Sequence, residues 1–128
     1  MDLLAAMPFA VELGVELVNA SPDEVRARLA WDERRCTAGG ILHGGALMTL
    51  ADSTGAILAY LNLPEGANAT ATIESKTNFF RPVSSGHVEA ASRVLHKGRT
   101  TIVVETDLRD DDGKHVARVT QTQAVLGG

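Results

Sequence analysis

Residues 41–63 of this chain read I-L-H-G-G-A-L-M-T-L-A-D-S-T-G-A-I-L-A-Y-L-N-L, and the rest of the sequence is interpreted from them. Apolar and small side chains recur here at helical spacing over several turns with no internal proline, which predicts a largely buried helix. The residues that set this spacing are Leu47, Leu50, Ala51, Thr54, Ile57 and Leu58. Asp52 lies in the middle of the same stretch. An acidic side chain in such surroundings must find a partner, face a cavity or stay protonated.

The predicted helix opens with His43-Gly44-Gly45. The first amides of a helix have no intrahelical acceptor and lie at the positive end of its dipole, and glycine lets another molecule approach that backbone closely. Asp52 follows His43 by nine residues. If His43 is already helical, the two side chains lie on roughly opposite faces and about 13 Å apart. A common site would then pair the His43 end of one subunit with Asp52 of another across a two-fold dimer.

The composition predicts one domain, residues 1–128, with enough apolar material for a core, since 45% of the chain is hydrophobic and 22% is charged. The formal charge of −4 gives no basic field for nucleic acid or an anionic membrane. Cys36 is the single cysteine, which excludes an internal disulfide and fits a reducing compartment. Residues 1–10 lack the basic start and long apolar run of a signal peptide. These features predict a cytoplasmic protein whose partners are neither nucleic acid nor membrane.

Hydrophobic alternation and turn residues predict the order β-β-α-β-β-β-β, an α+β chain in which a sheet wraps around one long helix. A short amphipathic helix is expected within residues 1–10, limited by Pro8. Asp112-Gly113 is a strong hairpin signal, and the four strands after the helix are expected to form a meander. The strands are expected at residues 15–19, 25–31, 69–80, 87–97, 100–109 and 115–126, with a loop at 32–40.

Four longer motifs fall in order along the chain. They are H-G-G-A-L-M-T-L-A-D at residues 43–52, T-N-F-F-R-P-V-S-S-G at 77–86, H-K-G-R-T-T at 96–101 and D-D-G-K-H-V-A-R at 111–118. In this combination the chain resembles the hot-dog-fold acyl-CoA thioesterases, in particular the PaaI-like branch of phenylacetate-pathway and enterobactin-pathway proofreading thioesterases and the Arthrobacter-type 4-hydroxybenzoyl-CoA thioesterase.

The resemblance implies a hot-dog fold, in which an antiparallel sheet wraps around a central helix and two subunits join into a continuous sheet. It implies a homodimer within a homotetramer, with active sites at the dimer interface. It also implies hydrolysis of an acyl-CoA or acyl-carrier-protein thioester without a metal or dissociable cofactor. Coenzyme A enters as part of the substrate.

The same resemblance assigns catalytic roles. Asp52 matches the family's carboxylate, which acts either as nucleophile on the thioester carbon or as base for water, and both routes stay open. Gly44 matches the residue whose backbone N–H polarises the thioester carbonyl, and His43 matches a residue that orients the thioester or assists the departing thiol. Thr37 stands where relatives carry Asn or Gln to hold the water or the carbonyl, and Ala56 stands where some relatives carry Ser or Thr.

Further positions are expected to contact the acyl group or coenzyme A. Arg81 and the turn at residues 97–100 fall where relatives contact the nucleotide and phosphates, and cations with free amides suit those anions. The substrate-binding and coenzyme-binding positions are Gly45, Thr54, Ala56, Ile57, Asn78, Phe80, Arg81, Lys97, Gly98, Arg99 and Thr100.

Other interpretations of the same residues stay open. Asp52 is also a candidate structural acid bonded to Ser or Thr, His43 a candidate helix cap, and Arg81 a candidate solvated cation. The competing functions are a hot-dog hydratase or dehydratase acting on acyl thioesters and a non-catalytic acyl-CoA-binding protein. Thr37 and Ala56 favour the binding protein, because the usual polar partners of the reaction are missing there.

The sequence excludes several other chemistries. Its four histidines show no H-x-H or H-x-x-x-H spacing, and one cysteine cannot make a structural zinc site, so no metal site is predicted. An HGG loop also occurs in α/β-hydrolases, but their G-x-S-x-G elbow is missing. The glycines around His43 do not follow the G-x-G-x-x-G pattern of dinucleotide-binding folds.

Overall fold

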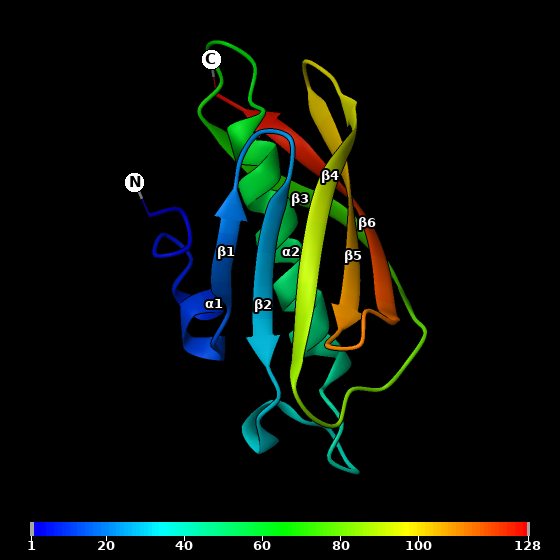
Figure 1. Ribbon diagram of the computed structural model, residues 1–128. Coiled ribbons are helices and arrows are strands. Elements are labelled where there is room, and N and C mark those ends of the chain that lie inside the picture. The colour runs from blue at the N-terminus through cyan, green and yellow to red at the C-terminus, as the bar shows by residue number, and fades with distance from the viewer. Residues whose placement is uncertain (1, 128) are drawn as a thin grey trace.

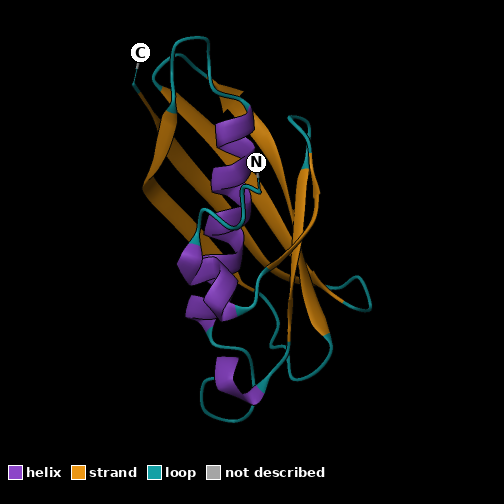
Figure 2. Cartoon of the chain, turned by 90° about the vertical axis from the view of Figure 1, so that its left-hand side faces the viewer, coloured by secondary structure: helices purple, strands orange, loops and turns teal. Residues whose placement is uncertain are grey.

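The computed structural model describes residues 2–127, in which six strands form one antiparallel sheet around one long helix (Figures 1 and 2). The strand order across the sheet is β1-β2-β4-β5-β6-β3. This is the α+β hot-dog architecture that the sequence predicted. The elements in chain order are α1 Pro8–Leu13, β1 Glu16–Ala20, β2 Val25–Ala30, the 3₁₀ turn Glu33–Arg35, α2 Gly44–Leu61, β3 Ala69–Phe79, β4 His87–Lys97, β5 Thr101–Asp110 and β6 His115–Leu126.

An apolar face holds α2 against the inside of the sheet. Leu50 packs in one core cluster with Val88 of β4 and Leu108 of β5, and Leu58 packs in a second cluster with Val104 of β5. All five side chains are fully buried, and each contributes about 1.5–3 kcal/mol by leaving water. The predicted buried helix is therefore confirmed. Neither α2 nor any other helix within residues 2–127 is long and apolar enough to cross a membrane.

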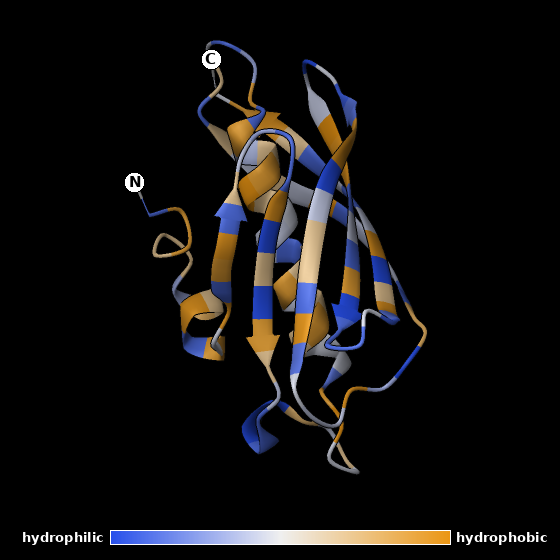
Figure 3. Cartoon of the chain, in the orientation of Figure 1, coloured by the Kyte–Doolittle hydropathy of each residue, from blue (hydrophilic) through white to orange (hydrophobic). Residues whose placement is uncertain are grey.

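Strands β2, β4 and β5 alternate between buried and more exposed residues as predicted. Along β2 the hydropathy alternates in the same way, as bands of colour (Figure 3). The predicted four-strand meander, however, is wrong. Strands β4, β5 and β6 follow one another in the sheet, but β3 pairs with β6 and not with β4. The connection after β3 crosses the end of the sheet, where the backbone amides of Phe80 and Arg81 donate to the carbonyl of Val116. Strand β2 then occupies the edge of β4 that β3 would have taken.

As a result β3 is an edge strand. Its eleven residues pair on one side with β6, and the other side has no partner among residues 2–127. Most of the strand is exposed, including 63% of Ile73 and 50% of Phe79. An edge of this length with apolar side chains is a place where a second chain can pair.

The first helix differs from its prediction. It was expected within residues 1–10 and limited by Pro8, but α1 begins at Pro8 and runs to Leu13. Proline suits the first turn of a helix because the amide it lacks has no acceptor there. The helix ends at Gly14, whose φ of 105° lies in the left-handed region that glycine adopts without strain.

The outer face of the sheet carries a cluster of charges around Asp107 of β5. Its carboxylate lies 3.1 Å from Arg118 Nε, 3.3 Å from Arg93 Nη1 and 2.8 Å from His115 Nε2. Burial of the carboxyl alone would raise the pKa of Asp107, but the hydrogen bond from Arg118 and the charges of Arg118, His115 and Arg93 outweigh it. They hold the pKa of Asp107 below its usual value.

Asp107→Asn is expected to lower the free energy of unfolding at pH 7 by about 1 kcal/mol, since it removes the charge from a partly wet cluster. Because the pKa of Asp107 is lower in the folded state, this contribution is present above the ordinary value of 3.8 and is lost as the pH falls through the folded-state value. Urea unfolding measured from neutral to strongly acidic pH should show that the difference in unfolding free energy between the variant and wild type becomes smaller in acid. Glu12→Gln, on the exposed face of α1, is the control, and a pH-independent difference would contradict the assignment.

Candidate active site

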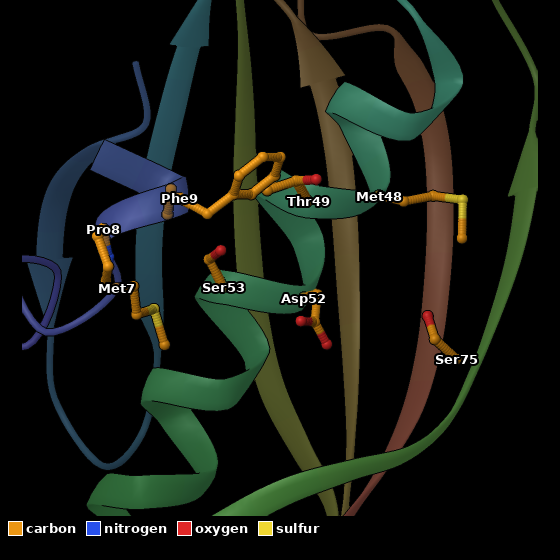
Figure 4. A pocket seen from close by; sticks show the side chains of 9 residues that line it. Met7, Pro8, Phe9, Met48, Thr49, Asp52, Ser53 and Ser75 are labelled. Atoms are coloured by element: carbon orange, nitrogen blue, oxygen red, sulfur yellow. The ribbon is translucent and has the colours of Figure 1, made fainter. Parts of the chain in front are cut away.

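Asp52 lies near the middle of α2 and opens onto a hollow of about 480 Å³ between α1, α2 and β3. Met7, Phe9 and Met48 supply apolar walls. The partly exposed Asp52 side chain extends from α2 and lies between Ser53 and Ser75 in the view of Figure 4. The structure therefore confirms one expected outcome for Asp52, that its side chain faces a cavity.

Asp52 also finds partners. The hydroxyl of Thr72 in β3 donates to Asp52 Oδ1 at 2.7 Å, and the side-chain amide of Gln121 in β6 donates to the same oxygen at 3.1 Å. Asp52 Oδ2 has no hydrogen-bond partner among residues 2–127. One oxygen is thus fixed to the protein, and the other keeps its full capacity to accept hydrogen bonds from other groups.

Sequence reasoning missed both donors. A signal was present in β6, where Gln121 follows the buried Val119 at the two-residue spacing of one sheet face. A polar residue that continues the buried face of a strand marks a polar partner on the element packed against it.

His43 is not helical, so the premise used to place it opposite Asp52 is wrong. It is the N-cap of α2 with extended backbone, φ −63° and ψ 136°, and its Nδ1 accepts the Gly45 amide at 2.7 Å. The cap satisfies one of the orphan amides of the helix start. The argument from opposite faces of the helix is therefore lost. The start of α2 and Asp52 are still separated by the rise of the helix, since Gly44 and Asp52 are eight residues and about 12 Å apart along its axis.

Gly44 begins α2, and its N–H has no acceptor within residues 2–127. The ring of Phe79 packs directly against it, since a Cβ at Gly44 would lie 3.1 Å from Phe79 Cζ. This amide is therefore a free donor at the positive end of the helix dipole, beside an aromatic wall.

Thr37 lies at the same end of the molecule as His43. Its amide donates to the carbonyl of Ile41 at 2.8 Å, and the His43 amide donates to the carbonyl of Arg35 at 2.9 Å, which closes the loop before α2. The Thr37 side chain is exposed. Thr37, His43, Gly44 and Gly45 are thus brought together at the helix start, and Asp52 is not among them.

Two of the expected acyl-contact positions line a second hollow of about 520 Å³, between the N-terminal segment, α2 and β3. Ala56 and Ile57 face it with Tyr60, and Met7 belongs to both hollows. Thr54 lies elsewhere, since it is buried in the core and its hydroxyl donates to the Leu50 carbonyl at 2.6 Å.

The expected coenzyme-binding positions form two separate groups. Asn78, Phe80 and Arg81 are exposed at the end of β3, whereas residues 97–100 lie at the turn between β4 and β5. The eleven residues of β4 separate the two groups, a length of about 36 Å. Figure 1 shows the turn at the opposite end of the molecule from the connection that follows β3. One chain therefore does not bring the two groups to the same place.

Within residues 2–127, no three His, Cys, Asp or Glu side chains are grouped so as to hold a metal ion. The single cysteine, Cys36, is free and partly buried.

A family model described as the thioesterase superfamily matches residues 39–117, well over half of the chain. The match includes the helix start, Asp52, Thr72 and the connection after β3. It ends before Gln121, whose role therefore comes from the structure alone.

Curated and solved relatives cover nearly the whole chain. The protein PA1618 of Pseudomonas aeruginosa is 35% identical over 118 residues, which are 91% of this chain and 81% of that protein. A solved mutant of PA1618, described as a thioesterase, has a TM-score of 0.91 at 32% identity and covers 98% of this chain and 92% of its own. The proofreading thioesterase EntH of Cronobacter turicensis is 31% identical over 115 residues, 90% of this chain and 83% of that protein. Thioesterase HI1161 of Haemophilus influenzae has a TM-score of 0.90 at 29% identity, covering 97% and 86% of the two chains.

Proposed function

This chain belongs to the thioesterase superfamily and is a thioester hydrolase, and from that premise we propose that it converts acyl-CoA thioesters to a free acid and coenzyme A at a site shared by two subunits. The observation that carries the proposal is the Asp52 carboxylate, which lines a hollow with apolar walls and whose Oδ2 oxygen has no hydrogen-bond partner in the described part of the chain. A carboxylate held in that way can act on a substrate without first breaking a bond to the protein.

Asp52 Oδ2 is proposed as the reacting atom. In the general-base route it takes a proton from water while the water oxygen attacks the thioester carbon. In the nucleophilic route it attacks that carbon itself, and water then hydrolyses the mixed anhydride. Either route breaks the carbon–sulfur bond, and the thiolate leaves and takes up a proton.

The helix start is proposed to bind the thioester carbonyl. The free Gly44 N–H donates to the oxygen as negative charge develops on it, aided by the helix dipole. Because His43 Nδ1 accepts the Gly45 amide, the neutral ring carries its proton on Nε2. That N–H is available to orient the carbonyl or to protonate the departing thiolate.

Two subunits are proposed to complete each site, since about 12 Å of one helix separates Gly44 from Asp52. The open edge of β3 supports a dimer in which the two sheets join. If the two β3 strands pair in antiparallel fashion, the two subunits point in opposite directions. The loop between β4 and β5 of one subunit then lies at the same end of the dimer as Arg81 of the other. Coenzyme A would then meet cations from both chains, and dimers would pair further into a homotetramer.

The acyl group is proposed to occupy the hollow beside Ala56, Ile57 and Tyr60. This hollow adjoins the one that holds Asp52, because Met7 lines both. The α2 residues on this hollow are mainly apolar, which suits a medium-chain or aromatic acyl group.

A cytoplasmic location is also proposed. It is supported by Cys36, the single cysteine, which is free.

A thiol-release assay over a panel of aromatic and medium-chain acyl-CoA substrates tests the proposed function. We expect release of free coenzyme A matched by free acid. A change in double-bond absorbance without thiol release would point instead to a hydratase. Tight binding without turnover would point to an acyl-CoA-binding protein, and either result would overturn the proposal.

Mixed subunits test the shared site. Asp52→Asn chains and Gly44→Pro chains are each expected to keep about 1% of wild-type activity or less alone. After exchange at equal amounts they should give about a quarter of wild-type activity, because half of the dimers are mixed and each has one intact site. Exchange is confirmed by native mass spectrometry with one chain isotopically labelled. If mixed dimers form and stay inactive, the site lies within one chain.

The proposed chemistry uses only water and protein groups. Dialysis against EDTA is therefore expected to leave kcat for thiol release unchanged, whereas a metal-activated water would be lost with its metal. The measurement compares dialysed enzyme with and without added zinc or magnesium. Activity that falls and returns with one of these ions would contradict this part of the proposal.

A further inference from the structure

Two buried glutamines interrupt the apolar inner face of β6. Ala117 and Val119 continue that face normally, but Gln121 and Gln123 follow at the same spacing and each is 1% exposed. Burying an amide is costly unless it is hydrogen-bonded, so these side chains need polar partners inside the fold.

The partners form a chain that ends at Asp52. Gln123 Nε2 donates to Thr72 Oγ1 at 2.6 Å, and the Thr72 hydroxyl donates to Asp52 Oδ1 at 2.7 Å. Thr72 has one hydroxyl proton, and an ionised carboxylate only accepts, so the bond from Gln123 fixes the Thr72 proton in the direction of Asp52. Gln121 Nε2 supplies the second donor to the same oxygen.

Helix α2 makes room for Gln121 at Gly55. A Cβ at this position would lie 2.3 Å from Gln121 Oε1 and 3.0 Å from Val104 Cγ2. Glycine in a helix interior costs about 0.5–1 kcal/mol relative to alanine. The chain accepts this cost one turn from Asp52, where it lets the Gln121 amide reach the carboxylate.

A β-bulge in β3 makes room for Thr72. The register with β6 shifts between Thr72 and Glu74, so Thr72 pairs with Gln123 and Ser75 pairs with Gln121. The irregularity leaves both Thr72 and Ser75 on the side of the strand that faces α2. The bulge and Gly55 thus make room for the two residues that donate to Asp52 Oδ1, and Gln123 supports one of them.

We propose that Thr72, supported by Gln123, and Gln121 are positioning residues that anchor Asp52 Oδ1 and so present Oδ2 to the thioester. The inference rests on the proposed function, since it assigns Oδ2 as the reacting atom. Two donors on Oδ1 from two different strands fix the rotation of the carboxylate about its Cβ–Cγ bond. Misplacement of a reacting atom by about 1 Å is enough to cost roughly a hundredfold in rate.

Thr72→Val and Gln121→Met remove one donor each with little change in size. Each is expected to lower kcat roughly tenfold with KM unchanged, the effect of losing one hydrogen bond to a charged group, and the double variant roughly a hundredfold. Thr72→Ser keeps the hydroxyl and should restore most of the rate. In an Asp52→Asn background Thr72→Val should cost nothing further, because the group it positions is gone. Thermal unfolding of each variant checks that the fold is intact.

A second readout does not depend on turnover. The carboxyl carbon resonance of Asp52, identified by its loss in Asp52→Asn, should shift in Thr72→Val and keep its position in Thr72→Ser. If wild type releases thiol while the double variant keeps wild-type kcat, the anchoring role is overturned and the proposed function stands. If wild type releases no thiol, the proposed function fails, and an unshifted resonance in Thr72→Val would overturn the anchoring role as well.

Discussion

Asp52→Asn is expected to lower kcat for thioester hydrolysis by roughly a thousandfold while the protein stays folded. An amide cannot take a proton from water or attack the thioester carbon, whichever of the two routes operates. The fold should tolerate the change, because the side chain is partly exposed and its remaining oxygen can still accept from Thr72 and Gln121. The thiol-release assay measures the loss, and thermal unfolding checks the fold.

Ser53→Ala is the matched control for Asp52→Asn. Ser53 is the next residue on α2 and lines the same hollow, so it tests whether any small change there is damaging. We expect its kcat to remain within a few-fold of wild type. If Asp52→Asn kept most of the activity, or Ser53→Ala lost as much, the central role of the Asp52 carboxylate would be wrong.

Gly44→Pro is expected to lower kcat roughly a hundredfold, the usual effect of removing one donor from an oxyanion site. The backbone conformation at this position is compatible with proline. Proline suits the first position of a helix, and the extended ψ of 136° at His43 suits the residue before a proline. The Gly44 N–H has no acceptor within residues 2–127, so its loss removes no bond of the described fold.

Gly44→Ala separates the lost N–H from the added bulk. Alanine and proline both place a Cβ against Phe79, at 3.1 Å from its Cζ, but alanine keeps the amide hydrogen. Phe79 is half exposed and can move slightly to admit the extra atom. The ratio of the two rates therefore isolates the hydrogen bond, and equal rates in Gly44→Ala and Gly44→Pro would show that this amide plays no part in the reaction.

The central helix and the six strands were predictable because each is encoded by a local repeat. A period near 3.6 in residues 41–63 and a period of two in the strands are visible in any short window. The partner of β3 was not predictable in that way, since alternation identifies a strand but not its neighbour. The position of β3 beside β6 depends on how residues 80–86 cross the end of the sheet, which is a property of the assembled fold.

The residues of the candidate site show the same difference between local and long-range information. Asp52 and Gly44 could be singled out from sequence, because a carboxylate in an apolar helix and glycines at a helix start are local anomalies. Thr72 and Gln123 escaped notice, since their meeting requires the β3–β6 pairing and its bulge. The helix was expected to include His43 but begins one residue later, at Gly44. The error arose because an N-cap residue borders the helix while its own backbone is extended.

The open edge of β3 also bears on how this protein is made. A newly synthesised subunit presents an unsatisfied row of amides and carbonyls with Ile73 and Phe79 beside them, a template on which misassembled chains can nucleate. If two copies pair at this edge as proposed, dilution leaves more chains unpaired, and resistance to heat should increase with protein concentration. In the proposed dimer, expression yield then depends on how fast two copies meet as well as on how well each one folds.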